Sequence, residues 1–152
     1  MEEVQIEAPA KINIGLDVVG KREDGYHLVR MIMQTVALSD TIVVKRETQG
    51  VSMQCIGEGE AKTLETDDRN LCIRAANLMK KNHALSNGYT ISLTKRIPIQ
   101  AGMAGGSTDA AAVMLAINRL ENLKLSEDTL MKEAVAIGAD VPYCILKKTA
   151  LA

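Results

Sequence analysis

The sequence predicts one domain of the α+β class, in which several antiparallel strands precede the first helix. Up to about residue 56, most segments alternate between apolar and polar residues, as strands with one buried face do. Later segments place apolar residues at helical spacing and are separated by glycine-rich or polar connections. With 152 residues, the chain is long enough to bury roughly 68–70% of its unfolded surface, and no second domain fits.

The first part of the chain contains the expected strands. Pro9 interrupts the alternation and is expected to separate the first strand from the second. Residues 20–25 are rich in glycine and charge and predict a turn-rich loop before the third strand. The expected strands cover residues 4–8, 11–18, 27–36, 41–46 and 51–56.

Two helices and a further strand are expected in the middle of the chain. Leu71, Ala75 and Leu78 would share the apolar face of the first helix, with Asp67 or Asp68 as its cap. This helix should stop near residues 82–88, a strand should cover 90–97, and the second helix should cover 107–121.

The C-terminal part predicts a third helix and a last strand. Ser126 should begin the helix, which has acidic residues in its first turn, and Gly138 is placed to end it. Pro142 pushes the preceding residue toward an extended conformation and leaves Asp140 at the boundary of an element. Residues 143–146 are expected to form the strand.

Composition and charge favour a soluble globular protein. The chain is 47% hydrophobic and has a formal net charge of -1, so it lacks the excess positive charge with which many proteins bind nucleic acid. There is no Phe or Trp and only three Tyr, so the core must be aliphatic, and eight Met can fill irregular gaps.

The cysteines predict buried, reduced thiols. Cys55, Cys72 and Cys144 are odd in number and widely spaced, which favours neither a disulfide framework nor a zinc site. No apolar targeting segment or membrane span is visible in the sequence. A cytoplasmic protein without a membrane partner is therefore expected.

Residues 98–112, PIQAGMAGGSTDAAA, join a glycine-rich loop to an alanine-rich helix. The glycines allow a tight turn with exposed N–H groups, and the helix start adds unpaired N–H groups and its positive dipole end. The order strand, loop, helix therefore favours phosphate binding, although the spacing fits neither a Walker loop nor a dinucleotide fold. The alternative is a flexible connector, with Ser107, Thr108 or Asp109 as ordinary capping residues.

Four segments in order resemble the GHMP kinase superfamily, which includes galactokinase and the homoserine, mevalonate and phosphomevalonate kinases. The segments are PAKINIGLD (9–17), GKREDGYHL (20–28), PIQAGMAGGSTD (98–109) and GADVP (138–142). The resemblance runs from about Ala8 to the last residues. It implies an α+β fold like domain 2 of ribosomal protein S5, with a mixed or antiparallel sheet and helices on one face.

The resemblance implies a kinase that uses ATP and Mg²⁺. It is strongest for the branch that phosphorylates the C2 hydroxyl of a cytidine diphosphate-linked methylerythritol, a step of the non-mevalonate route to isoprenoids. By family match, Asp140 would be the general base, and Lys11 would hold Asp140 ionised and stabilise developing negative charge. Taken alone, Asp140 could be a turn carboxylate and Lys11 a solvated strand lysine.

The resemblance also implies binding residues. Asn13, Tyr26 and His27 would face the substrate, although a lone loop histidine is more often a surface residue. Asn70 would lie near adenine, with helix capping as the competing explanation. No carboxylate cluster indicates the magnesium ligands. The remaining implied ATP contacts are Pro98, Ala101, Gly102, Met103, Ala104, Gly105, Gly106, Ser107 and Thr108.

Two departures from the family pattern are visible. The family loop commonly reads GLGGGSS; Met103 and Ala104 are expected to change only bulk, and Thr108 keeps the hydroxyl. The family also has a second domain of comparable size, and this chain ends before one could begin, so an N-terminal fragment is expected.

Three alternatives remain open for this fragment. It could be a nucleotide-binding or interaction module without turnover, or another small-molecule kinase of the superfamily. An RNA-binding domain like that of ribosomal protein S5 is disfavoured, because the charge and the scarce aromatic residues lack the expected footprint. A dimer through an apolar edge at residues 143–146 is also possible.

Overall fold

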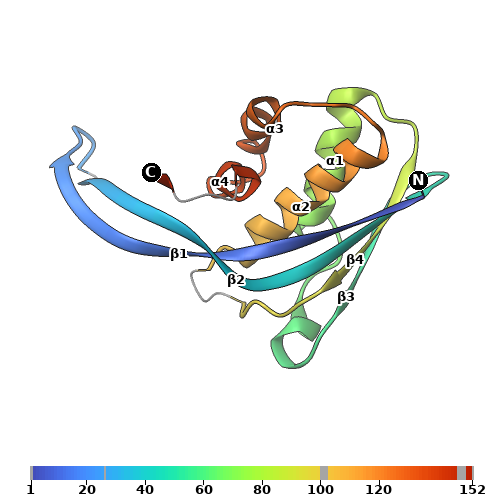
Figure 1. Ribbon diagram of the computed structural model, residues 1–152, viewed down its shortest axis with the longest axis horizontal. Coiled ribbons are helices and arrows are strands. Elements are labelled where there is room, and N and C mark those ends of the chain that lie inside the picture. Colours follow the sequence, from blue (N-terminus) through green and yellow to red (C-terminus); the bar gives the residue numbers. More distant parts are fainter. Residues whose placement is uncertain (1, 26, 100–102, 147–149, 152) are drawn as a thin grey trace.

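The computed structural model describes residues 2–25, 27–99, 103–146 and 150–151. Its helices cover one face of a sheet (Figure 1). α2 lies against β1 and β2, α1 packs against α2, and α4 packs against α2 and α3. The elements are β1 (Glu3–Lys21), β2 (His27–Glu47), β3 (Val51–Ile56), the 3-10 helix η1 (Gly59–Thr63), α1 (Leu71–His83), β4 (Gly88–Thr94), α2 (Gly105–Leu120), α3 (Glu127–Ala134), α4 (Val141–Leu146) and β5 (Ala150–Leu151).

The main sheet has the strand order β1-β2-β4-β3. β1 pairs antiparallel with β2, and β2 pairs antiparallel with β4, but β3 and β4 are parallel. α1 connects this parallel pair, since parallel strands need a crossover connection. The short β5 pairs with β2 at Ile32 and Met33. The mixed sheet with helices on one face confirms the predicted fold class.

β1 and β2 are long, and each joins two segments that the sequence predicts as separate strands. Pro9 remains in the ladder opposite Ser39, and the register shifts between Pro9 and Lys11. β1 is an edge strand, where a proline removes no ladder hydrogen bond on the open side and a bulge is tolerated. The prediction that Pro9 separates two strands is therefore wrong.

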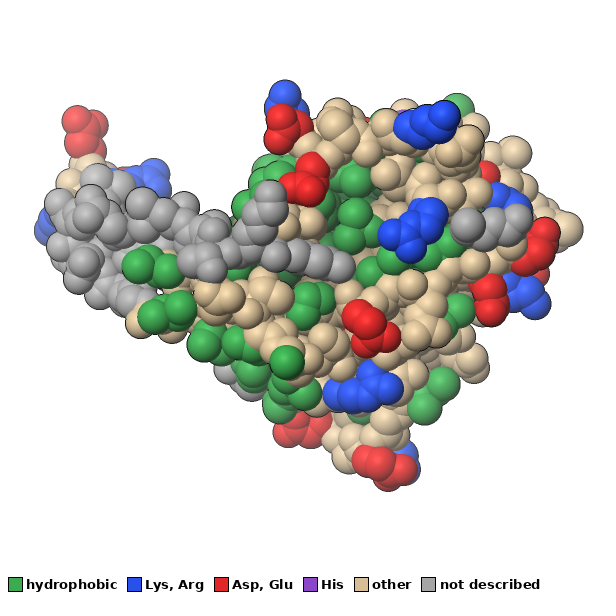
Figure 2. Space-filling view, in the orientation of Figure 1, with side chains coloured by type: hydrophobic (Ala, Val, Ile, Leu, Met, Phe, Trp, Pro, Cys, Tyr) green, Lys and Arg blue, Asp and Glu red, His purple; other side chains and the backbone are tan. Residues whose placement is uncertain are grey.

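The β1–β2 ribbon has one half beneath the helices and one half that projects beyond them (Figure 1). In the covered half, Val4 and Ile6 are buried against the helical layer. Beyond the buried Lys11, Ile12 is 39% and Ile14 is 58% exposed. Figure 2 shows hydrophobic side chains on the surface along this projecting half.

The cap predicted for α1 differs from the observed one, whereas the start predicted for α3 is observed. Asn70 caps α1, because its side-chain oxygen accepts a hydrogen bond from the N–H of Cys72. The expected cap at Asp67 or Asp68 is therefore wrong. Ser126 caps α3 as predicted. In the described part of the chain, no helix is both long and apolar enough to cross a membrane.

Residues 141–146 form α4, and the predicted last strand is therefore wrong. Pro142 is the second residue of this helix, where its missing N–H would have no partner within the helix. The helix begins with a hydrogen bond from the N–H of Cys144 to the carbonyl of Asp140. Val141, Tyr143, Cys144 and Ile145 are buried. The apolar edge expected to support a dimer is thus covered by α2 and α3.

Candidate functional site

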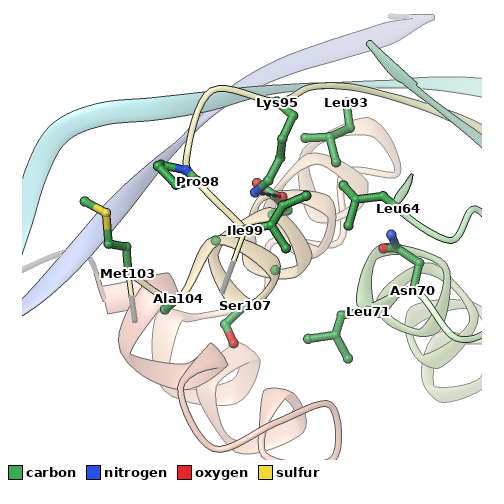
Figure 3. Close-up of a pocket in the computed structure, with 13 residues that line it drawn as sticks. Leu64, Asn70, Leu71, Leu93, Lys95, Pro98, Ile99, Met103, Ala104 and Ser107 are labelled. Carbon is green, nitrogen blue, oxygen red and sulfur yellow. Dashed lines mark hydrogen bonds and ion pairs between the residues drawn. The ribbon is translucent and has the colours of Figure 1, made fainter. Parts of the chain in front are cut away.

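A pocket of about 300 Å³ lies where the glycine loop enters α2 (Figure 3). Leu64, Leu71, Leu93 and Ile99 supply apolar walls that the sequence did not indicate. Of the residues predicted to bind ATP, the pocket is lined by Asn70, Pro98, Met103, Ala104, Gly105, Gly106 and Ser107. Ala101 and Gly102 lie outside the described residues. Thr108 does not line the pocket and is buried.

The start of α2 presents backbone donors to this pocket. The first hydrogen bond of the helix runs from the N–H of Thr108 to the carbonyl of Ala104, at 2.9 Å. The preceding N–H groups of Gly105, Gly106 and Ser107 therefore have no partner within the helix. Together with the positive end of the helix dipole, they make the pocket suitable for an anionic group such as phosphate.

Ala104 enters the helix in a left-handed conformation, with a φ of 55°. This region of backbone space favours glycine, because a Cβ atom there approaches the following carbonyl. The expectation that alanine at this position changes only bulk is therefore wrong. The change from the family's glycine also introduces backbone strain.

Of the two loop glycines that the structure describes, Gly105 lies closer to a neighbouring side chain. A Cβ atom on Gly105 would lie 2.7 Å from Nζ of Lys95, whereas a Cβ atom on Gly106 would lie 3.8 Å from Cδ1 of Leu71, an ordinary contact. A side chain at position 105 would therefore force the ammonium of Lys95 to shift. Gly106 has no such restriction from the described residues.

Lys95 belongs to a buried charged cluster that sequence reasoning missed. It extends from the end of β4 toward α2 (Figure 3). Its ammonium lies 2.6 Å from Oδ2 of Asp40 and 3.2 Å from Oδ2 of Asp109. Oδ1 of Asp40 accepts hydrogen bonds from the N–H groups of Arg96 and Ile97. Asp40 thereby holds the segment after β4 against β2.

The two carboxyls of this cluster have opposite pKa shifts. Burial raises the pKa of Asp109 well above its usual range, and the neighbouring Asp40 adds to this shift. Burial also acts to raise the pKa of Asp40, but hydrogen bonds from Asp109, Ile97 and Lys95 outweigh burial and lower it. Asp109 sits in an alanine-rich, apolar stretch of α2, and this was the only sequence signal for the cluster.

Lys11 lies next to the glycine loop. Its backbone N–H donates to the carbonyl of Met103 at 3.1 Å, and its ammonium donates to Oδ1 of Asn13 at 3.4 Å. Lys11 as a whole is only 7% exposed and is therefore not a solvated strand lysine. The structure thus places the predicted catalytic lysine beside the pocket and Asn13 beside the lysine.

Asp140 immediately precedes α4, at the boundary predicted for it. Asp140 and Lys11 both act on the thiol of Cys144, which Asp140 makes harder and Lys11 makes easier to ionise. Both residues therefore act electrostatically on the same thiol, but no ion pair within 4 Å joins these two described residues. α4 is also attached to β2 near Lys11, because the hydroxyl of Tyr143 lies 3.3 Å from Oγ1 of Thr35.

The structure leaves the backbone of His27, a predicted substrate residue of the second motif, far from the pocket. Tyr26 lies outside the described residues. His27 begins β2 and pairs with Lys21 at the far end of the ribbon. Lys11 pairs with Thr35, so at about 3.3 Å per residue the backbone of His27 lies roughly 26 Å along the strand from this point.

Asn70 both caps α1 and lines the pocket. Its Oδ1 accepts from the N–H of Cys72, and its Nδ2 donates to the carbonyl of Glu65 at 2.8 Å. The capping explanation is therefore confirmed. A contact with a base would have to use the remaining lone pair or the second amide hydrogen.

The described residues contain no group of three or more His, Cys, Asp or Glu side chains that could hold a metal ion. The backbone donors and apolar walls of the pocket fit a nucleotide, and its lining includes three side chains with oxygen atoms, those of Asn70, Ser107 and Asp109.

The mixed sheet, the helices on one of its faces and the glycine loop at the start of α2 define an α+β domain with a candidate anion-binding pocket. Residues 70–148 match the model of the GHMP kinases N terminal domain, and the chain belongs to this family. The match includes α1, the glycine loop, Asp140 and α4.

The names of individual relatives are more specific than the name of the family. The chain is 47% identical over 148 residues to a 4-diphosphocytidyl-2-C-methyl-D-erythritol kinase of Clostridium beijerinckii, covering 97% of this chain and 51% of that protein. It is 49% identical over 149 residues to the protein of that name from Clostridium perfringens (strain SM101 / Type A), covering 97% and 50%. The chain thus spans about half the length of the curated relatives it matches.

Solved structures agree with this assignment. A crystal structure of 4-(cytidine 5'-diphospho)-2C-methyl-D-erythritol kinase superimposes with a TM-score of 0.82 at 38% identity, over 98% of this chain and 51% of that one. Homoserine kinase from Cytophaga hutchinsonii has a TM-score of 0.73 at 20% identity, over 95% and 42%. The second likeness shows the fold alone.

Proposed function

We propose that the chain is the N-terminal part of a kinase that transfers the γ-phosphoryl group of ATP to the C2 hydroxyl of 4-diphosphocytidyl-2-C-methyl-D-erythritol. One observation carries the proposal. Seven of the ten residues that the family resemblance assigns to ATP line a single pocket at the start of α2, and the buried Lys11 is attached to the same loop. The names of the relatives supply the substrate.

The pocket supports the ATP half of the reaction. Phosphoryl transfer requires mainly positioning and stabilisation of charge. The N–H groups of Gly105, Gly106 and Ser107 would bind phosphate oxygens, and the leucines and Ile99 would receive the base. Mg²⁺ would neutralise phosphate charge when bound, as is general for this chemistry.

Lys11 and Asp140 support the acceptor half. An alkyl hydroxyl is a poor nucleophile, and a positioned carboxylate contributes about 10²–10⁴-fold as general base. Asp140 would accept the hydroxyl proton, and the buried ammonium of Lys11 would stabilise the negative charge that develops. Asn13 would orient Lys11 through its side-chain oxygen, and Tyr26 and His27 would contact the cytidine end.

A second candidate is a nucleotide-binding module without turnover. The observation that favours it is the coverage, because the chain spans about half of its relatives. If the substrate lies between two domains, this chain binds ATP but lacks part of the acceptor site.

One experiment separates the two candidates. ADP release is measured with ATP, Mg²⁺ and the cytidyl substrate for the chain, for Asp140→Asn, and for Asp128→Asn, an exposed carboxyl on α3. The kinase proposal predicts turnover that depends on the substrate and is lost only in Asp140→Asn. Nucleotide binding without turnover would support the module, and turnover by a protein of the relatives' full length would then show what is missing. Absence of both binding and turnover would contradict both candidates.

A further inference from the structure

Three buried ionisable side chains meet beneath the glycine loop. Asp40 comes from β2, Lys95 from the segment after β4, and Asp109 from the second turn of α2. Two ionised carboxylates and one ammonium would leave a net negative charge in this site. A buried charge without compensation is unfavourable, and such groups bind a proton instead. One of the two carboxyls should therefore be neutral.

Hydrogen bonding indicates which carboxyl is neutral. Apart from a proton on Asp109, Asp40 accepts from three donors: Nζ of Lys95 at 2.6 Å, the N–H of Arg96 at 2.5 Å and the N–H of Ile97 at 2.8 Å. Such an acceptor is stable as an anion. Asp109 accepts only from Lys95, at 3.2 Å, and its Oδ1 is buried with no partner among the described residues. The neutral carboxyl is thus that of Asp109, in agreement with the direction of its pKa shift.

We propose that Asp109 is a proton-bearing positioning residue of the glycine loop. As a neutral acid it donates to the carboxylate of Asp40. The positive charge of Lys95 and the negative charge of Asp40 then balance each other. This contact connects α2 to the sheet, and it holds the ammonium against Gly105. The position of the N–H groups at the start of α2 then depends on the proton of Asp109.

The effect on a ligand rests on the proposed function, in which the pocket receives phosphate. Asp109 lines this pocket. Loss of its proton would add a negative charge close to the phosphates and weaken their binding. A neutral Asp109 avoids this repulsion.

No other described group compensates an ionised Asp109. Among the described residues, the other titratable side chains that interact electrostatically with Asp109, besides Asp40 and Lys95, are the thiols of Cys55 on β3, Cys72 on α1 and Cys144 on α4. Burial raises the pKa of each thiol, so all three stay neutral. Lys95 is thus the cation on which both carboxyls depend.

The proton is tested directly by infrared spectroscopy of the ligand-free chain. At about pH 7 the wild type should show the C=O stretch of a protonated carboxylic acid, because the ordinary pKa of aspartate is near 3.9. The band should vanish in Asp109→Asn and remain in Asp128→Asn, the control with an exposed carboxyl. A wild type without the band, or a band that persists in Asp109→Asn, would overturn the proposal.

Thermal unfolding supplies a second test without ligand. A raised pKa in the folded state means that the wild type loses stability as pH rises from about 4 toward the pKa of Asp109. The melting temperature of Asp109→Asn should therefore increase relative to that of the wild type as pH rises. Parallel curves for the two proteins would contradict a titrating Asp109.

Positioning is tested by calorimetric titration with ADP at about pH 7. Asp109→Asn keeps a neutral donor and should bind within about threefold of the wild type, whereas Asp109→Ala removes the contact and should bind at least about tenfold more weakly. Equal losses in both variants would overturn the role of a neutral carboxyl. If the wild type binds no ADP but shows the infrared band, the proposed function fails and the proton assignment stands.

Discussion

Ala104 is the residue at which the loop departs most clearly from the family pattern. An L-residue in the left-handed region costs about 1–2 kcal/mol, and glycine instead loses about 0.5–1 kcal/mol of backbone entropy. Ala104→Gly should therefore increase the free energy of unfolding by about 0.5–1 kcal/mol, measured by urea denaturation. Ala112→Gly, within α2, should decrease it by a similar amount. A loss in both variants would contradict the left-handed conformation of Ala104.

The two glycines that follow Ala104 should differ in their tolerance of a side chain. Gly105→Ala places a methyl group against the ammonium of Lys95, which Asp40 and Asp109 hold in place. We expect a loss of about 1–3 kcal/mol in unfolding free energy, as for an overpacked core. Gly106→Ala makes only an ordinary contact and adds helix propensity, so its stability should not fall. Thermal melting of both variants compares them directly.

At the scale of single residues, the sequence predicted what the local chain determines. The glycine loop, the boundary at Asp140 and the cap at Ser126 depend on neighbouring residues and were found. The Lys95 cluster joins positions 55 and 14 residues apart in the chain. No local pattern predicts such partners, because the folded sheet brings them together.

At the scale of elements, Asp40 connects β2 to the segment that follows β4. Asp40→Ala removes the partner of a buried ammonium and of two backbone N–H groups, and breaking such a pair costs about 3–5 kcal/mol. Asp40→Asn should lose less, because the amide oxygen can still accept from the N–H groups. Urea denaturation measures both variants, with the exposed Asp68→Ala as control. If Asp40→Ala lowers the free energy of unfolding by less than about 1 kcal/mol, the contacts of Asp40 do not stabilise the fold.

Element boundaries were predicted less well than element types. The sequence divided β1 at Pro9 and β2 after residue 36. Both strands are continuous because they pair with each other along their length, and the edge position of β1 tolerates Pro9. At Pro142 the rule for residues before proline predicted an extended chain. Packing against α2 and α3 instead favours a short helix, in which proline is acceptable in the first turn. Tertiary contacts thus decided both cases.

At the scale of the whole molecule, the reactivity of the three cysteine thiols measures how well the core excludes solvent. Burial raises the pKa of Cys144 to about 12, and Cys72 is also buried. At about pH 8 the thiolate fraction of Cys144 would be about one in ten thousand, and thiolate is the reactive form. Brief alkylation of the native protein should leave Cys72 and Cys144 unmodified, whereas the half-buried Cys55 should react first. Mass spectrometry after digestion identifies the modified residues, and early labelling of Cys144 would contradict the buried position of α4.

The order of the strands was the part of the fold that periodicity could not supply. Alternation predicts strands but not partners, and the parallel pairing of β3 with β4 follows from the position of α1 between them. The fold class itself was predicted, because the family resemblance and the separation of strands from helices agreed.

Lys11 lies at the border between the covered half and the projecting half of the β1–β2 ribbon. Before Lys11, β1 is covered by the helical layer, and after it the strand is exposed along Ile12 and Ile14. In hydrogen exchange, amides before Lys11 should open only with the whole domain, and those after it should open with the ribbon alone. The bond from Lys11 to Met103 lies at this border. We therefore expect local opening of the ribbon to stop at the residue that also fixes the glycine loop.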